Sequence, residues 1–230
     1  YGLSRKWRYW ELRGGEGLFY GKPYSASYVR HVLALAKDVH LLQKNLQGRK
    51  KTSIRKAERE GVTVLRTTAL SDIELFYQLH CRTRKKHGVP PQPIRFFQKL
   101  HEHMISCGQG ALFLGRYRGR TISGALFLHF AREAVYKFSA SDSAFLKLGS
   151  NDLIIWTAIE QYAREGYEVM CFGRTELENT GLMQFKKGWG AQEQTIQYYK
   201  YDLQKNTYIH NNMKAVGRHN SIFRTIPLPL

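Results

Sequence analysis

The chain has 230 residues, of which 43% are hydrophobic, and it carries a formal net charge of +18. This length and apolar content are sufficient for a buried core, which excludes an intrinsically disordered chain. The excess of basic residues predicts anionic partners, among them nucleic acid, nucleotides, anionic lipid and acidic cell-envelope precursors, without choosing one.

Cysteine usage and hydropathy indicate the compartment. Cys81, Cys107 and Cys171 lack the CxxC spacing of metal or redox pairs and lie in or beside apolar segments, so we expect reduced thiols in the cytoplasm. No apolar run approaches the ~20 residues that cross a bilayer. A basic protein of this kind can still meet the anionic inner face of the membrane.

Hydrophobic periodicity and turn residues predict an alternation of strands and helices. Ser71 and Glu74 form a capping-box pattern at the start of one helix, and Gly61 and Gly166 are expected to end two others. In chain order, we expect strands over 8–13 and 26–33, a helix over 38–60, a strand over 62–66, a helix from 71, a helix after the Pro90–Pro93 break, strands over 111–117, 121–130 and 134–141, a helix over 152–164, a strand over 168–173, a short helix over 182–187 and a strand over 194–201.

This order predicts an α/β (mixed α+β) domain built on one sheet over residues 47–203, followed by a tail over 204–230. The chain begins with Tyr1, and no complete domain precedes residue 47. We therefore interpret residues 1–46 as the extended end of a truncated first domain plus a linker.

Five sequence blocks in the same order and spacing resemble a known family. They are Lys51–Ala57 with Gly61-Val62, Phe76-Tyr77 through Thr83–Pro90, Ile122–Ala125, Leu153–Ile159, and Phe172–Thr175 leading to Gly181-Leu182 and Phe185-Lys186. Together they resemble the second domain of the FemAB-like peptidyltransferases and the related BioF2-like acetyltransferases, two branches of the GNAT superfamily. The resemblance implies a GNAT acyltransferase fold over 47–203, with residues 1–46 left over from a preceding GNAT-like domain.

The resemblance also implies an acyl donor, which is aminoacyl-tRNA in the FemAB-like branch and acetyl-CoA in the acetyltransferase branch. In the GNAT fold, a helix N-terminus next to the diverging fourth and fifth strands offers its amides to the donor. Gly149, Ser150 and Asn151 occupy that place here, but the segment 147–151 has one glycine, unlike the RxxGxG-type loop of acetyl-CoA users. The same residues also fit a plain helix cap.

Lys186 matches the family lysine at the start of the last helix, where the resemblance implies contact with phosphate or with negative charge that develops on the acyl carbonyl. Because Leu182, Phe185 and Trp189 recur at helical spacing, we expect them to be buried and Lys186 to face the cleft margin. Its alternative is a solvated surface lysine.

Arg174 follows a strand and suits phosphate or carboxylate, or an ion pair with Glu176 or Glu178. We expect it to face the same cleft as Gly149–Asn151. Phe185, Tyr136 and Tyr198 complete the expected substrate-binding set.

Lys51, Arg55 and Arg59 lie on one face of the predicted helix and form a basic surface, which is either solvated or in contact with tRNA, a lipid-linked precursor or a first domain. Arg82, Arg84, Lys85, Lys86 and His87 form a second basic patch with the same alternatives. His101 and His103 are two residues apart, which does not suit a metal site on a helix, and we expect no metal. A general base is not evident; Tyr136, Tyr198 and Tyr199 are the hydroxyl candidates.

These features predict an N-acyltransferase that moves an aminoacyl or acyl group to an amine of a cell-envelope, polysaccharide or nucleotide-sugar precursor. One alternative is an acetyl-CoA-dependent enzyme acting on a sugar or small amine. A second alternative, from another class, is a basic module that binds nucleic acid or an anionic surface without catalysis.

Overall fold

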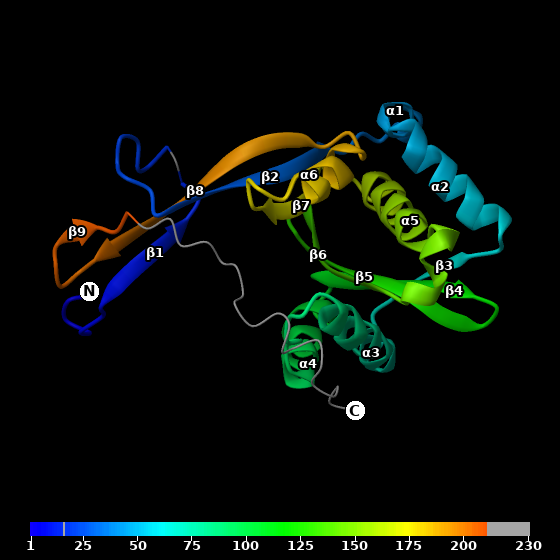
Figure 1. The fold of residues 1–230 in the computed structure, drawn as a ribbon, viewed down its shortest axis with the longest axis horizontal. Coiled ribbons are helices and arrows are strands. Elements are labelled where there is room, and N and C mark those ends of the chain that lie inside the picture. Colours follow the sequence, from blue (N-terminus) through cyan, green and yellow to red (C-terminus); the bar gives the residue numbers. More distant parts are fainter. Residues whose placement is uncertain (16, 211–230) are drawn as a thin grey trace.

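The computed structural model describes residues 1–15 and 17–210 of the chain, and its strands form one mixed sheet (Figure 1). The strand order is β1-β8-β2-β7-β6-β5-β4-β3, with β9 paired to β8. The strands are β1 (Tyr9–Arg13), β2 (Ala26–Ala34), β3 (Thr63–Thr67), β4 (Gly110–Tyr117), β5 (Arg120–Phe130), β6 (Glu133–Ser141), β7 (Val169–Thr175), β8 (Gln192–Asp202) and β9 (Thr207–Tyr208). All neighbours are antiparallel except β6 and β7, which are parallel.

Helices cover both faces of the β3–β6 half of the sheet, because its strands are apolar on both faces. In β4, Leu112 and Leu114 enter one core and Ala111 and Phe113 enter the other. The helices are α1 (Val39–Asn45), α2 (Gly48–Arg59), α3 (Leu70–Lys86), α4 (Ile94–Leu100) with a π-helical turn (His101–Ile105), a 3-10 helix (Ser143–Leu148), α5 (Ser150–Arg164) and α6 (Thr180–Lys187). Figure 1 shows α1, α2, α5 and α6 on one side of the sheet and α3 and α4 on the other.

The parallel pair β6 and β7 diverges, and this divergence positions the candidate site. Pairing joins 133–135 of β6 to 169–171 of β7, although both strands continue for several residues beyond it. A bulge in β6 adds to the divergence, because Leu126 of β5 faces Phe138 while the next residue, Phe127, faces Tyr136. Bulges bend a strand and re-aim its side chains. The two strands therefore open toward their carboxyl ends.

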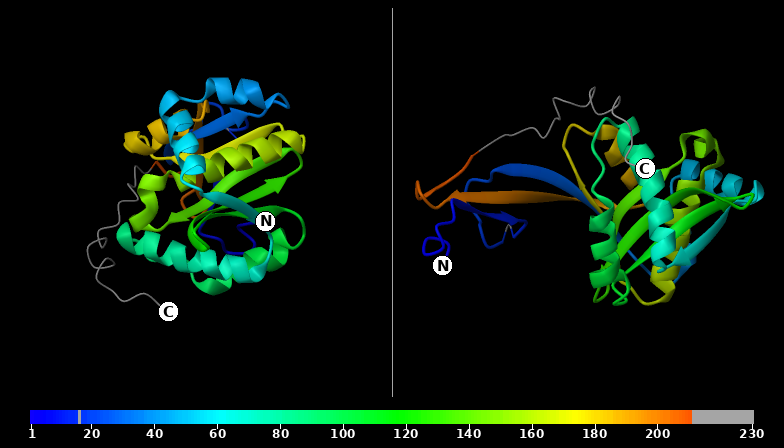
Figure 2. Two further views of the ribbon diagram at one scale, coloured as in Figure 1. Left: turned by 90° about the vertical axis from the view of Figure 1, so that its right-hand side faces the viewer. Right: turned by 90° about the horizontal axis from the view of Figure 1, so that it is seen from below.

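The first two strands are present as predicted, but they belong to the same sheet as the rest of the chain. β2 lies between β7 and β8, and β1 pairs with the other edge of β8. The sheet thus continues across the predicted boundary between residues 46 and 47, and residues 47–203 alone do not contain the whole sheet. Figure 2 shows β1, β9 and the outer part of β8 extending away from the helical layers. The interpretation of residues 1–46 as the end of a preceding domain remains a prediction.

Two local predictions are corrected. The single helix expected over 38–60 is two helices, because Leu46 is buried in an extended conformation and the next N–H, that of Gln47, donates to the Gly188 carbonyl. The capping box at Ser71 does not form, since α3 begins at Leu70.

The tail predicted over 204–230 contains β9 in its described part. The rest of that tail lies outside the described residues. Within the described ranges, no helix is long and apolar enough to cross a membrane.

Candidate active site

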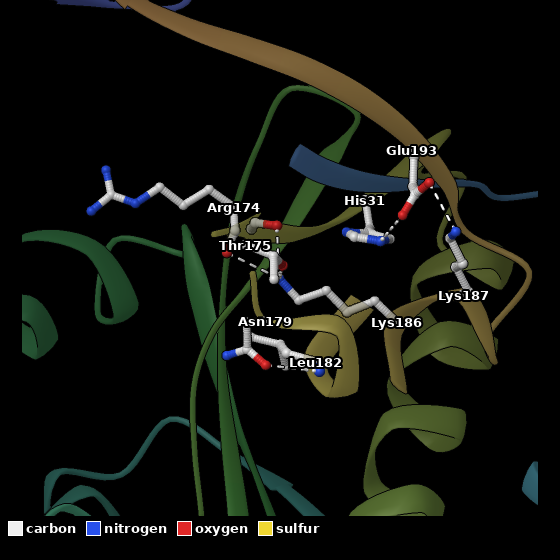
Figure 3. A network of polar contacts seen from close by, with 9 residues as sticks. His31, Arg174, Thr175, Asn179, Leu182, Lys186, Lys187 and Glu193 are labelled. Atoms are coloured by element: carbon white, nitrogen blue, oxygen red, sulfur yellow. Dashed lines mark hydrogen bonds and ion pairs between the residues drawn. The ribbon is translucent and has the colours of Figure 1, made fainter. Parts of the chain in front are cut away.

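Lys186 is buried at the divergence of β6 and β7, which corrects its predicted place at the cleft margin. Its side chain crosses from α6 to the end of β7 and is only 3% exposed (Figure 3). The ammonium donates to the Gly173 carbonyl at 2.9 Å, the Arg174 carbonyl at 3.2 Å and Thr175 Oγ1 at 2.8 Å. Three acceptors therefore hold the cation at one position.

The rotation of α6 explains why Lys186 is buried. Asn179 caps the helix by accepting from the Leu182 N–H, and the helix then turns Lys186 toward β7. Trp189 is fully buried and Phe185 is half-buried, as expected, but Leu182 is 37% exposed. Burial lowers the pKa of Lys186 to about 8, with the Cys171 thiol opposing the shift. At neutral pH the side chain remains a cation.

A second titratable group lies beside Lys186. His31 of β2 is fully buried, with Nε2 at 3.3 Å from Glu193 Oε1, and Glu193 also pairs with Lys187 at 2.9 Å (Figure 3). Burial, and then the charge of Lys186, lower the pKa of His31. The imidazole is thus neutral at pH 7, and its contact with Glu193 is not an ion pair.

The N-terminus of α5 lines a cavity of about 240 Å³ that is also bounded by residues of α2, β5, β6 and α6. Gly149, Ser150, Asn151 and Phe185, all predicted as site residues, line it. Ser150 hydrogen bonds with Ser123 of β5. These four residues thus lie together in space, and their role in substrate binding stays a prediction.

Gly149 has a packing reason to be glycine. Its φ is +72°, and a Cβ there would lie 2.6 Å from Ser53 Oγ and 2.7 Å from the Ser53 carbonyl oxygen. Only glycine adopts this conformation readily and permits such close approach. Helix α2 therefore occupies the space next to the α5 N-terminus.

An ion pair in this cavity was not predicted from the sequence. Lys50 Nζ of α2 lies 2.6 Å from Asp152 Oδ1 of α5, and both side chains are largely buried. The same ammonium lies 3.9 Å from the centroid of the Phe185 ring and 4.6 Å from that of Trp189. Burial is the main cause that lowers the pKa of Lys50, and Asp152 opposes it. Lys50 stands in a basic run, so nothing in the sequence marks it.

Tyr136 lies where β6 departs from β7, with its ring against Phe127 and Phe172. Burial raises the pKa of its hydroxyl to about 12, while hydrogen bonds with Ser139 and Asn151 oppose the shift. A phenol with this pKa is a proton donor at neutral pH. Tyr136 therefore does not suit the general-base role considered for it.

Arg174 does not share a cavity with Gly149–Asn151, which corrects that prediction. Gly173 has a φ of +71°, and the register between β2 and β7 shifts at this point. The bulge turns Arg174 to the sheet face opposite α6, where it donates to Tyr198 Oη and lies over the Tyr28 ring. Among residues 1–15 and 17–210, Arg174 makes no ion pair with Glu176 or Glu178.

The remaining predicted residues lie apart from the opening. Arg55 and Arg59 are exposed on α2 and Lys51 is half-buried, and none of the three lines the cavity. Thr83, close to the second basic patch, lies beside the end of β6, where its Oγ1 accepts from the Ser141 N–H at 3.3 Å. In the described part of the chain, no group of three or more His, Cys, Asp or Glu residues could hold a metal ion.

A mixed sheet with a diverging parallel pair, and a helix N-terminus beside the opening, is the arrangement of a GNAT acyltransferase fold. The acetyltransferase (GNAT) domain model matches residues 43–187, and the chain belongs to this family.

The curated relative and the FemX structure are consistent with the FemAB-like branch that the sequence resembles. The chain is 22% identical over 91 residues to UDP-N-acetylmuramoylpentapeptide-lysine N(6)-alanyltransferase of Weissella viridescens. The matched segment covers 40% of this chain and 27% of the relative. The crystal structure of FemX superposes with a TM-score of 0.68 at 16% identity, over 77% of this chain and 62% of that chain. The structure of L-PGS from Bacillus licheniformis gives a TM-score of 0.55 at 13% identity, over 87% and 64%. The chain thus spans about a quarter of the curated relative and less than two thirds of FemX.

Proposed function

We propose that the chain is an N-acyltransferase of the FemAB-like branch that transfers an aminoacyl group from aminoacyl-tRNA to an amine of a cell-envelope precursor. The observation that carries this proposal is the buried Lys186 ammonium, held by three acceptors where β6 and β7 diverge. A fixed cation at the opening of a GNAT sheet suits negative charge that develops during acyl transfer.

In the proposed reaction, the neutral acceptor amine attacks the ester carbonyl of the donor. A C–N bond forms, the C–O bond to the donor ribose breaks, and in net one proton passes from the amine to the ribose oxygen. Lys186 stabilises the oxyanion by the electrostatic field of its charge, because its three N–H groups already donate to the end of β7 and its pKa of about 8 keeps it a cation at neutral pH. We assign the Tyr136 hydroxyl, protonated at that pH, to donate its proton to the leaving ribose oxygen, and the proton lost by the amine then restores the hydroxyl.

Two observations favour an aminoacyl ester over acetyl-CoA as the donor. The segment before α5 has one glycine, Gly149, and Ser53 occupies the space where a Cβ of that residue would lie. A backbone cradle for pyrophosphate needs open glycine faces near a helix N-terminus. The alternative, an acetyl-CoA-dependent enzyme, is supported by the description of the matching family.

The acceptor class follows from the relative, whose name states transfer of alanine to the lysine of a UDP-linked muramoyl pentapeptide. We propose a UDP-linked or lipid-linked cell-envelope precursor, and a cytoplasmic protein that works at the inner face of the membrane. The net charge of +18 suits both an RNA donor and a phosphorylated acceptor.

A donor comparison tests the proposal. The chain is incubated with UDP-N-acetylmuramoyl-pentapeptide and either alanyl-tRNA or acetyl-CoA, and the acceptor mass is measured. We expect an added alanyl residue with alanyl-tRNA and no added acetyl group. Acetylation by acetyl-CoA would establish the alternative, and RNA binding with neither product would establish the non-catalytic module.

A further inference from the structure

Basic and aromatic side chains gather on the face of β1, β8, β2 and β7 that lies opposite α6. The register places Arg13 across from Tyr198, and Arg30 across from both Gln194 and Arg174. Since side chains alternate along a strand, residues two apart share this face. We call the following set the Arg–Tyr face: Tyr9, Arg13, Tyr28, Arg30, Arg174, Tyr198 and Lys200.

Cations and rings of the Arg–Tyr face are interleaved. The Arg174 guanidinium lies 4.9 Å from the centroid of Tyr28 and 5.3 Å from that of Tyr198, and Arg13 lies 5.4 Å from Tyr198 on its other side. Lys200 Nζ lies 3.7 Å from the centroid of Tyr9. These contacts orient the planar groups without neutralising their charge.

Among the described strand residues of this face, the carboxylates are Glu11 and Asp202, and Asp202 is buried and accepts from the N–H groups of Gln204 and Lys205. Arg30 bonds to the uncharged Gln194 at 2.9 Å, and Arg174 bonds to a tyrosine hydroxyl. Within residues 1–15 and 17–210, the ion pair of this face is that of Arg13 with Glu11. Helices α3 and α4 pack on β4, β5 and β6 (Figure 1). The Arg–Tyr face thus offers exposed guanidinium groups beside aromatic rings.

Arg174 contributes to both the Arg–Tyr face and the site around Lys186. The Arg174 side chain belongs to the face, while its carbonyl accepts from Lys186 at 3.2 Å on the other side of the sheet. Figure 3 shows the Arg174 side chain pointing away from Lys186. The Arg174 end of the face therefore lies directly across the sheet from Lys186.

We propose that the Arg–Tyr face binds the single-stranded 3′ end of an RNA and leads its terminal ester to the opening beside Lys186. Binding sites for single strands combine cations that track phosphates with rings and guanidinium planes on which bases stack, and this face has both. The inference rests on the proposed function, because an aminoacyl-tRNA donor ends in such a strand.

The test is fluorescence anisotropy with a 12-nucleotide single-stranded RNA that is not aminoacylated, titrated with the 230-residue chain at several salt concentrations. The double variant Arg13→Gln/Arg174→Gln should bind at least 10-fold more weakly, with a salt slope shallower by about 1.4 for two lost phosphate contacts. Tyr28→Leu should weaken binding by about 10-fold if one base stacks there. Arg30→Gln, which leaves the Tyr198 stack intact, provides a second variant if the double variant melts early.

The matched control removes charge elsewhere. Lys51→Gln/Arg55→Gln/Arg59→Gln on α2 should change the affinity less than the double variant does. An equal or larger loss from the α2 variant overturns the proposal. Unchanged RNA binding by the double variant, together with lost binding to phosphatidylglycerol vesicles, overturns it in favour of a lipid contact.

The probe carries no acyl group, so this experiment fails independently of catalysis. RNA binding at the Arg–Tyr face without aminoacyl transfer would refute the proposed function and leave this inference standing. Aminoacyl transfer that is unchanged in the Arg13→Gln/Arg174→Gln variant would refute this inference and leave the proposed function standing.

Discussion

Substitution of Gly149 by alanine separates a packing role from a role in phosphate binding. The φ of +72° makes any Cβ unfavourable by about 1 kcal/mol. A Cβ 2.7 Å from the Ser53 carbonyl oxygen must also displace backbone of α2, and such overpacking costs about 1–3 kcal/mol. The expected loss in free energy of unfolding is therefore about 3 kcal/mol.

Gly61→Ala is the matched control, because Gly61 has a similar φ of +83° with open space around its Cβ position. It should lose only the conformational part, about 1 kcal/mol. For a chain of this size 1 kcal/mol shifts the melting temperature by about 2–4 °C, so Gly149→Ala should melt about 6–12 °C lower and Gly61→Ala about 2–4 °C lower. Calorimetry measures both. Equal shifts in the two variants would refute the close packing of α2 on Gly149 and remove the argument against acetyl-CoA that depends on it.

Three further predictions concern buried charge. Asp152→Asn leaves Lys50 without its counter-charge and should lower the free energy of unfolding by about 2 kcal/mol in urea titrations. Glu102→Gln, which breaks the exposed pair with Lys99, should have a smaller effect, and equal losses would contradict the burial of the Lys50 pair. Burial lowers the pKa of His31, His80 and His129, so below about pH 6.5 the unfolded chain binds protons that the folded chain does not, and stability should fall as the pH falls. His31→Gln should reduce the dependence of the melting temperature on pH. A melting temperature that stays constant between pH 7.5 and 5.5 would be the contrary result. The pKa of Lys186 is about 8 in the folded chain and higher in the unfolded chain, so above pH 8 the unfolded chain binds more protons than the folded chain. Thermal melts of the wild type should therefore show stability rising from pH 8 to 10, and those of Lys186→Met should not.

Element order was largely predictable from the sequence because local periodicity and turn residues determine it. The strands predicted over 111–117, 121–130 and 134–141 differ from β4, β5 and β6 by one residue or less at each end. The insertion of β2 between β7 and β8 was not predictable, because the choice of an antiparallel partner depends on contacts between residues more than 100 positions apart.

The candidate site was predicted in part. Gly149, Ser150, Asn151 and Phe185 line one cavity, and the start of α5 at the first three was visible in the sequence pattern. The expectation that Arg174 faces this cavity was wrong, because a position after neighbouring strand ends does not account for the bulge at Gly173. Lys50 and Asp152 were missed because an ion pair across 102 positions leaves no local signal.

The burial of Lys186 shows the limit of helical spacing as evidence. Leu182 and Lys186 are one helical turn apart on α6, and apolar character alone predicts that Leu182 is the buried one. Three acceptors at the end of β7 reverse this preference, since they satisfy all three N–H groups of the ammonium.

The rate of aminoacyl transfer in three proteins tests the central claim most directly. Single-turnover transfer of labelled alanine from alanyl-tRNA to UDP-N-acetylmuramoyl-pentapeptide is measured for the wild type, Lys186→Met and Lys187→Met. The neighbouring Lys187 is 41% exposed and pairs with Glu193, so it controls for loss of one positive charge on the same helix. We predict a loss of about 100-fold for Lys186→Met and less than about 3-fold for Lys187→Met. Wild-type transfer by Lys186→Met, in protein shown to be folded, would contradict the assignment of the reaction to the opening beside Lys186.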